Sequence, residues 1–159
     1  MQPTHNTLSE NVRAQSGELL NLHLAAAIDL RGQLKQAHWN VRGPTFIAVH
    51  ELFDKVAETV EGYTDQIAER AAGLGAIAEG TVQVAAERSF LVPYPLRIAD
   101  EKEHLFAVAS TLAAYGQSVR EAIGKAAGFG DADTADLFTE VSRGVDRQIW
   151  LVEAHAPPK

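Results

Sequence analysis

The chain has 159 residues, a formal net charge of −7 at pH 7 and no cysteine. One domain of this length can bury a full hydrophobic core, and without cysteine it has no disulfide, thiolate metal ligand or cysteine nucleophile. The negative charge argues against a general affinity for nucleic acid or anionic membranes. With no apolar run of membrane-spanning length and no signal-peptide core, we expect a cytoplasmic protein, the nucleoid included.

Hydrophobic residues recur at helical spacing along the chain, and no segment alternates as a half-buried strand does. The first helix is predicted to begin at Thr7, where TLSE has the form of a capping box closed by Glu10. It ends at the breaker pair Gly43-Pro44. A second helix is predicted from about Thr45 to the glycines at positions 73 and 75.

Two further helices are predicted in the second half of the chain. One follows Pro93 and Pro95 and covers about residues 97–127. The other begins at an aspartate of the sequence DADTAD and runs to about His155, where Pro157-Pro158 closes it.

The connection at residues 74–96 is much longer than the other two. Short loops join antiparallel neighbours, whereas a long crossover can return along a bundle and join parallel ones. Within it, VQVAAERSF has the pattern of one short amphipathic helix. We therefore predict an all-α fold: a ferritin-like four-helix bundle with a long crossover between helices two and three that carries a short helix.

The predicted bundle spans residues 17–156. A short N-terminal extension, residues 1–16, merges into the first helix, and residues 157–159 form a C-terminal tail.

Four potential metal ligands lie along the second predicted helix. At 100° per residue, His50, Asp54, Asp65 and Glu69 all fall within about 100° of one another, on one stripe. Imidazole and carboxylate without thiolate suit a metal such as iron better than structural zinc. A solvated polar face would also explain these four residues, and helical phase alone leaves both interpretations open.

The spacing of the four residues is symmetric, because the pair 50 and 69 shares its midpoint with the pair 54 and 65. His50 and Glu69 lie about 28 Å apart along one helix, too far to bind one ion in one chain. A two-fold axis through the midpoint would pair His50 with Glu69 of a second copy, and Asp54 with Asp65. The spacing therefore predicts two equivalent sites across a dimer interface.

Another histidine, His38, precedes the break at Gly43-Pro44. Because the second helix returns antiparallel to the first, His38 is expected beside His50. A lone histidine on a helix is more often structural than a ligand, but a histidine pair facing symmetric carboxylates favours metal binding. His104, in the segment ADEKEH, is instead expected to be a solvated residue at a helix start.

These residues are similar to those of the Dps family, the mini-ferritins that protect DNA in starved cells. The likeness rests on KQAHWNVRGPTF, on the histidine twelve residues after His38 with its aspartate four residues further on, and on DQIAER. It continues through GTVQVAAERSFLVPYPL and DTADLFTEVSRGVDRQIWLVEAH. The resemblance implies an iron-storage ferroxidase: a hollow dodecamer that oxidises Fe(II), preferably with hydrogen peroxide, and stores ferric mineral.

Carried over by position, the resemblance implies catalytic iron ligands His38, His50 and Asp54 from one subunit, joined by Asp65 and Glu69 from its two-fold partner. Asp65 and Glu69 are then the tightest ligands, and His38 completes the site of the first iron. His50 and Asp54 serve a second, weaker iron.

The resemblance also implies an acidic pore near the start of the fourth helix, for which Asp136 and Asp146 are the candidates. DNA binding in the family commonly rests on basic tails. Here residues 1–18 contain one arginine and two glutamates, and residues 151–159 one lysine and one glutamate. Since phosphate neutralisation supplies most non-specific affinity, we do not expect direct DNA binding. A nucleoid-associated DNA-binding protector and a helical assembly with idle metal residues are the alternatives.

Overall fold

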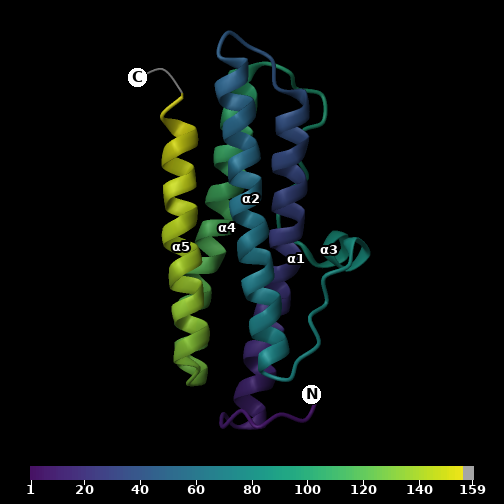
Figure 1. Cartoon of the computed structure of the whole chain (residues 1–159), viewed down its shortest axis with the longest axis vertical. Helices are drawn as coiled ribbons and strands as arrows, with labels where there is room; N and C mark the ends of the chain where they lie inside the picture. Colours follow the sequence, from purple (N-terminus) through teal and green to yellow (C-terminus); the bar gives the residue numbers. More distant parts are fainter. Residues whose placement is uncertain (156–159) are drawn as a thin grey trace.

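The computed structural model describes residues 1–155, which contain five helices: α1 (Glu10–Asn40), α2 (Phe46–Gly73), α3 (Val82–Arg88), α4 (Glu101–Phe129) and α5 (Ala132–Glu153). The four long helices lie side by side as a bundle, and α3 stands outside it, next to α1 (Figure 1). The predicted all-α fold, with a short helix in a long crossover, is confirmed. None of the helices within residues 1–155 has the length and apolar character needed to cross a membrane.

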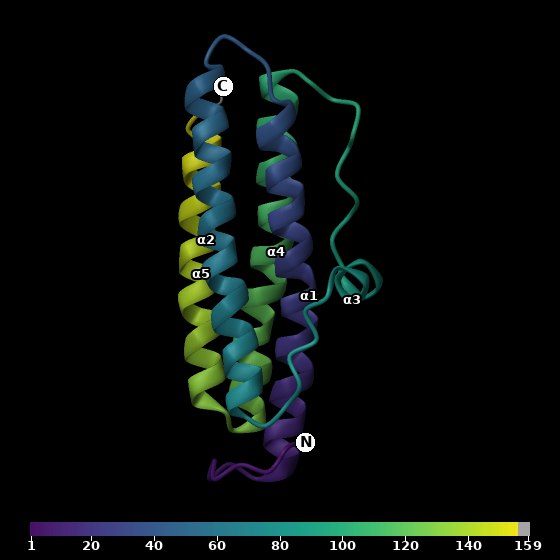
Figure 2. The ribbon, with the colours of Figure 1, turned by 45° about the vertical axis from the view of Figure 1, so that its right-hand side comes forward.

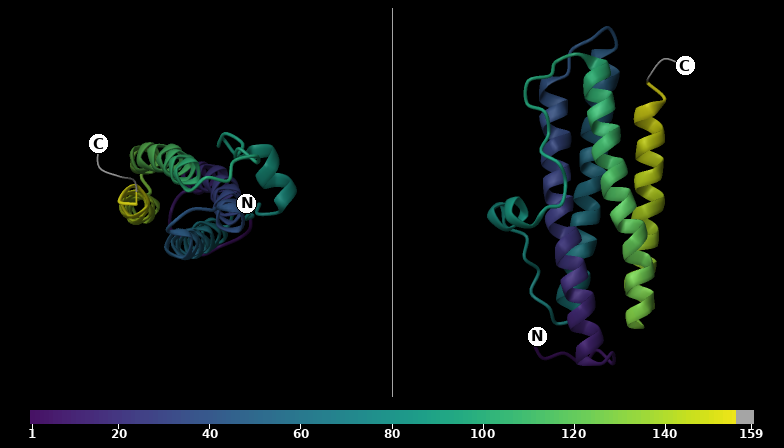
Figure 3. Two further views of the ribbon diagram at one scale, coloured as in Figure 1. Left: turned by 90° about the horizontal axis from the view of Figure 1, so that it is seen from above. Right: turned by 180° about the vertical axis from the view of Figure 1, so that it is seen from behind.

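The path of the chain explains why the crossover is long. α2 runs antiparallel to α1, and the segment after α2 then climbs back along the outside of α1 (Figure 2). It delivers the chain to the start of α4, which therefore runs parallel to α2, and α5 returns antiparallel to α4 (Figure 1). Seen from above, α3 lies beyond the ring of four helices (Figure 3).

The hydrophobic core fixes how α2 is rotated about its own axis. Val49, Phe53, Val56, Val60 and Ile67 are fully buried, and each such side chain contributes about 1.5–3 kcal/mol by leaving water. At 100° per residue, this apolar stripe is centred roughly 140° from the stripe of predicted metal ligands. Burial of one stripe thus keeps the other on the outside of the bundle.

The start of α1 differs from its prediction. Ser9, and not Thr7, caps the helix, because its Oγ accepts a hydrogen bond from the backbone N–H of Val12 at 3.3 Å. Glu10 is then the first helical residue and cannot close a capping box three positions after its cap. The capping-box prediction is therefore wrong by two residues, and α1 also ends earlier than predicted, at Asn40.

The other helix ends lie within about four residues of their predictions. α4 begins at residue 101 because Asp100 caps it, accepting a hydrogen bond from the N–H of Lys102 at 2.9 Å. It ends at Phe129, and the following Gly130 has a left-handed backbone (φ 87°) that suits glycine. As predicted, an aspartate of DADTAD caps α5. The predicted closure at Pro157-Pro158 and the tail of residues 157–159 lie outside the described residues.

His104 is buried, so its predicted exposure is wrong. Only 1% of its surface is exposed, and its Nδ1 shares a hydrogen bond with the Tyr94 hydroxyl at 2.7 Å. Burial lowers the pKa of His104. The physical reason is the crossover, which lays Tyr94 over the first turn of α4 and covers a face that looks solvated in the sequence.

Asp131 joins the end of α2 to the start of α5. Its carboxylate accepts hydrogen bonds from the N–H and hydroxyl of Thr134, at 3.1 and 2.6 Å, and from the Arg70 guanidinium at 2.7 Å. Burial alone would raise the pKa of Asp131, but the bonds from Thr134 and the charge of Arg70 lower it overall. The ionised form is thus the one that the fold stabilises.

We expect Asp131→Ala to lower the free energy of unfolding at pH 7 by about 1–2 kcal/mol, since it removes a helix cap. Because the pKa of Asp131 is lower in the folded chain than in the unfolded one, its contribution is present above about pH 4 and is lost as pH falls through the folded pKa. Urea unfolding at a series of pH values should show wild type and variant converging at low pH. Asp133→Ala, which alters an exposed neighbour 4.0 Å from Arg70, is the control; a difference independent of pH would contradict the assignment.

Candidate metal centre

The two histidines predicted to meet, His38 and His50, are stacked on one another. His38 lies in the last turn of α1 and His50 near the start of α2. Their ring centroids are 3.7 Å apart and the rings are inclined by 21°. The antiparallel return of the chain through residues 41–45 thus brings them together, as the sequence predicts.

Reciprocal hydrogen bonds fix the orientation of both rings. Nδ1 of His38 donates to the backbone carbonyl of His50, and Nδ1 of His50 donates to the carbonyl of His38, each at 2.8 Å. A carbonyl oxygen can only accept, so in the neutral form of each ring the proton is on Nδ1 and Nε2 keeps its lone pair. This is the arrangement by which proteins orient metal-binding histidines.

Asp54 lies one turn of α2 after His50 and is held by a lysine. Its Oδ1 accepts a hydrogen bond from Nζ of Lys35, in α1, at 2.5 Å. The bond from Lys35 lowers the pKa of Asp54, and His38 and His50 add to the effect. A cation that binds Asp54 at this oxygen must therefore displace the lysine ammonium.

Sequence reasoning missed Lys35, although a signal for it exists. The antiparallel register that places His38 against His50 also places a residue one turn earlier in α1 against a residue one turn later in α2. Lys35 and Asp54 occupy those positions. The lysine ammonium also lies over the ring of Trp39, 5.8 Å from its centroid.

Asp65 and Glu69 lie on the same stripe of α2 but toward its other end, and both are exposed. Fifteen residues separate Asp65 from His50, which is about 22 Å along the helix. The structure therefore does not bring these two carboxylates to the histidines of the same chain. Within residues 1–155, no three histidine, aspartate or glutamate side chains lie close enough together to hold a metal ion.

The midpoint of α2 coincides with the symmetry point of the predicted ligands on it. The helix runs from residue 46 to residue 73, so its midpoint falls between Thr59 and Val60. The pairs 50 and 69, and 54 and 65, share this midpoint. Two copies of α2 that cross antiparallel at their centres would overlap along their whole length while bringing each histidine near the partner's carboxylates.

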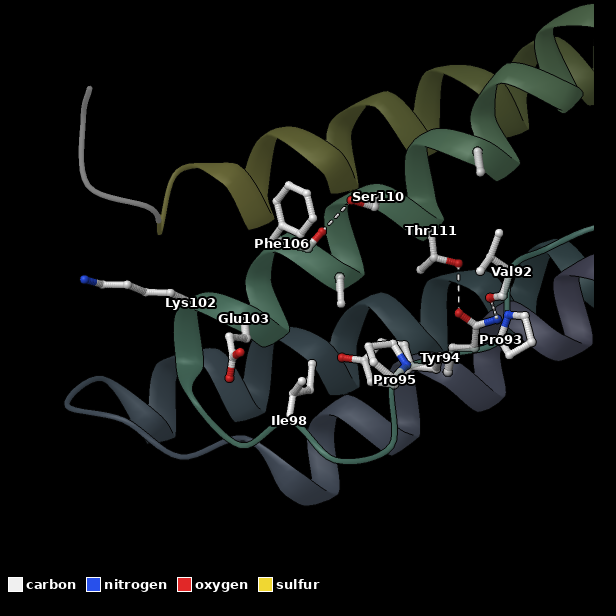
Figure 4. Close-up of a pocket in the computed structure, with 13 residues that line it drawn as sticks. Val92, Pro93, Tyr94, Pro95, Ile98, Lys102, Glu103, Phe106, Ser110 and Thr111 are labelled. Carbon is white, nitrogen blue, oxygen red and sulfur yellow. Dashed lines mark hydrogen bonds between the residues drawn. The ribbon is translucent and has the colours of Figure 1, made fainter.

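A separate cavity of about 660 Å³ lies between α4 and the end of the crossover (Figure 4). Its walls are mostly apolar and include Pro93, Tyr94, Pro95 and Phe106. Thr111 and Gln33 also line it, and the Thr111 hydroxyl donates to the Gln33 side chain at 3.0 Å. None of the five predicted metal ligands lines this cavity, so it is distinct from the candidate metal centre.

The chain is similar to known proteins along nearly its whole length. A family model described as a ferritin-like domain matches residues 17–156. The DNA protection during starvation protein of Agrobacterium fabrum is 40% identical over 156 residues, which cover 98% of this chain and 96% of that protein.

Solved structures give the same result. A tetragonal form of Mycobacterium smegmatis Dps has a TM-score of 0.93 and 31% identity, covering 99% of this chain and 95% of that one. Dps from Microbacterium arborescens in its high iron form has a TM-score of 0.85 and 32% identity, covering 96% of this chain and 97% of that one. Sequence, topology and these relatives agree that the chain belongs to the Dps family of ferritin-like proteins.

Proposed function

We propose that the protein is a cytoplasmic ferroxidase and iron store. It oxidises Fe(II), preferably with hydrogen peroxide, at sites shared by two subunits, and it holds the ferric product inside a hollow dodecamer. The observation that carries this proposal is the reciprocal hydrogen bonding of His38 and His50, which leaves both Nε2 atoms free to bind a metal. Membership of the Dps family, with a relative solved in a high iron form, supports the choice of iron.

The proposed site combines the two ends of α2 from two chains. His38, His50 and Asp54 of one subunit face Asp65 and Glu69 of its two-fold partner. The exposure of both distal carboxylates and the central position of the symmetry point on α2 support this pairing.

The five proposed ligands form two groups, and each group binds one Fe(II) ion. Both ions are substrates. Asp65 and Glu69 of the partner, with His38, bind the first iron tightly, because hard carboxylate oxygens favour the ferric product. His50 and Asp54 bind the second iron more weakly, since the Lys35 ammonium competes with that iron for Oδ1 of Asp54.

The proposed reaction is a two-electron step. Each Fe(II) gives one electron to hydrogen peroxide, the O–O bond breaks, and two protons from solvent complete two water molecules. The step yields two Fe(III) ions and releases no hydroxyl radical. Iron and peroxide are therefore removed together, which protects DNA and the cell from oxidative damage.

The iron path into the cage stays a prediction. Asp136, in α5, is exposed and free to line an acidic pore. Asp146 is less suited to that role, because both of its oxygens accept hydrogen bonds from Arg120, each at 2.8 Å.

The direct test is anaerobic titration of Fe(II) followed by hydrogen peroxide. We expect about two Fe(II) bound per subunit before any turnover, then a rise in ferric absorbance that is faster with peroxide than with oxygen. Iron oxidation no faster than in buffer would contradict the proposal.

Mixing two inactive variants tests whether the site is shared. In a mixed dimer of His50→Ala and Glu69→Ala chains, one site carries both changes and the other carries none. Random co-assembly should therefore restore about a quarter of wild-type peroxide-dependent iron oxidation, because half of the dimers are mixed and each has one intact site of two.

A matched mixture serves as the control. His38→Ala and His50→Ala alter the same half of the site, so their mixed dimers contain no intact site and should recover nothing. If co-assembled particles of His50→Ala and Glu69→Ala, verified by mass, also stay inactive, the shared site is refuted.

Direct DNA binding is the alternative function, favoured by the names of the curated relatives. With a net charge of −7 and no excess of basic residues in positions 1–18 or 151–159, the chain should leave plasmid mobility in a gel unchanged at physiological salt and neutral pH. A variant carrying a short lysine-rich N-terminal tail provides the positive control. Retardation of the plasmid by the wild type, lost at high salt, would favour the alternative.

A further inference from the structure

We propose that Glu101, the first residue of α4, is a positioning residue of the metal centre. It clamps the turn between α1 and α2 and so keeps His38 beside His50. The role at a metal centre rests on the function proposed above, whereas the clamp itself rests only on the contacts described below.

Glu101 is a buried carboxylate whose two oxygens are both engaged by one residue. Only 8% of the surface of Glu101 is exposed. Oε2 accepts a hydrogen bond from the backbone N–H of Thr45 at 3.0 Å, and Oε1 accepts one from the Thr45 hydroxyl at 2.7 Å. Because a buried carboxylate is costly unless it is hydrogen-bonded, these two bonds tie α4 firmly to the turn.

The clamp brings an acceptor to the start of α2, which lacks a side-chain cap of its own. Thr45 occupies the N-cap position, but its side chain does not bond to its own helix, and the first turn of α2 has no acidic residue. The free N–H groups at a helix start favour an acceptor with negative charge. Glu101, in α4, supplies both the acceptor and the negative charge.

The rest of the turn is shaped to receive Glu101. The N–H of Arg42 donates to the carbonyl of Ala99 at 2.9 Å, which fixes the turn to the residues just before α4. At Gly43, an added Cβ would lie 2.5 Å from Oε2 and 2.6 Å from Cβ of Glu101. Only glycine leaves room for the carboxylate at this position.

The histidines depend on this turn for their register. His38 lies three residues before Val41, and His50 lies five residues after Thr45, so residues 41–45 are the connection that sets one helix end against the other. The turn and the start of α4 lie at the same end of the bundle (Figures 1 and 2). A turn that drifts away from α4 would stretch the two 2.8 Å bonds that orient the imidazoles.

Four variants of the full chain test the clamp. Glu101→Ala removes it, and Gly43→Ala displaces the carboxylate without changing any charge. Glu101→Gln keeps an acceptor for the Thr45 N–H and a group that can bond to the Thr45 hydroxyl, and should rescue. Tyr94→Phe is the control, because it deletes a buried hydrogen bond to the first turn of α4 and leaves residues 41–45 untouched.

Two measurements are made on each assembled variant. Hydrogen exchange reports on the amides of residues 45–50 without any metal. Anaerobic titration with Co(II), followed by its visible absorption, reports on imidazole ligation without turnover. We expect Glu101→Ala and Gly43→Ala to exchange faster at residues 45–50 and to bind Co(II) about tenfold more weakly, the lower end of the loss caused by removing a partner that orients a ligand. Glu101→Gln and Tyr94→Phe should stay within about threefold of wild type, a change too small to reflect a misplaced ligand.

Each other outcome has a definite meaning. Unchanged exchange in Glu101→Ala and Gly43→Ala would overturn the clamp. Faster exchange with unchanged Co(II) affinity would overturn the positioning role. Failure of the wild type itself to bind Co(II) through imidazole would overturn the proposed function and with it the role of Glu101 at a metal centre, while the exchange data would still report on the clamp.

Discussion

The antiparallel packing of α1 on α2 is the constraint on which the candidate metal centre depends. The buried stripe of α2 fixes the rotation of that helix, and the turn at residues 41–45 fixes its register against α1. From these two conditions follow the stacking of His38 on His50, the contact between Lys35 and Asp54, and the outward position of Asp65 and Glu69. No single ligand is placed by its own local sequence alone.

The polar contacts of His38, His50 and Asp54 hold all three side chains in defined orientations. Each imidazole donates its N–H to a backbone carbonyl, so that the other ring nitrogen keeps a lone pair that can accept a hydrogen bond or bind a metal. The hydrogen bond from Lys35 lowers the pKa of Asp54, and the lysine can move aside on its flexible stem. In the proposed site, the half contributed by one chain is therefore ordered without iron, and the exposed Asp65 and Glu69 at the far end of α2 are the groups we propose for a second chain.

Several features of the fold and the site were predictable because they depend on periodicity and spacing. The four helices, the long crossover with its short helix, and the meeting of His38 with His50 follow from breakers, helical phase and antiparallel return. The start of α1 did not follow, because Thr7 and Ser9 are both suitable caps and only the structure distinguishes them. The burial of His104 and the role of Glu101 depend on contacts between separate elements, which no local pattern records. Lys35 was missed although the register that predicts the histidine pair also places it against Asp54.

The measurement that tests the central claim most directly is a crystal structure of the protein loaded anaerobically with Fe(II), with the metals located by anomalous scattering. We expect the metals at the interface of two antiparallel α2 helices, contacted by His38, His50 and Asp54 of one subunit and by Asp65 and Glu69 of the other. The two sites of a dimer should lie roughly 22 Å apart, the rise of fifteen helical residues. Metals bound inside one four-helix bundle by a single chain would contradict this expectation.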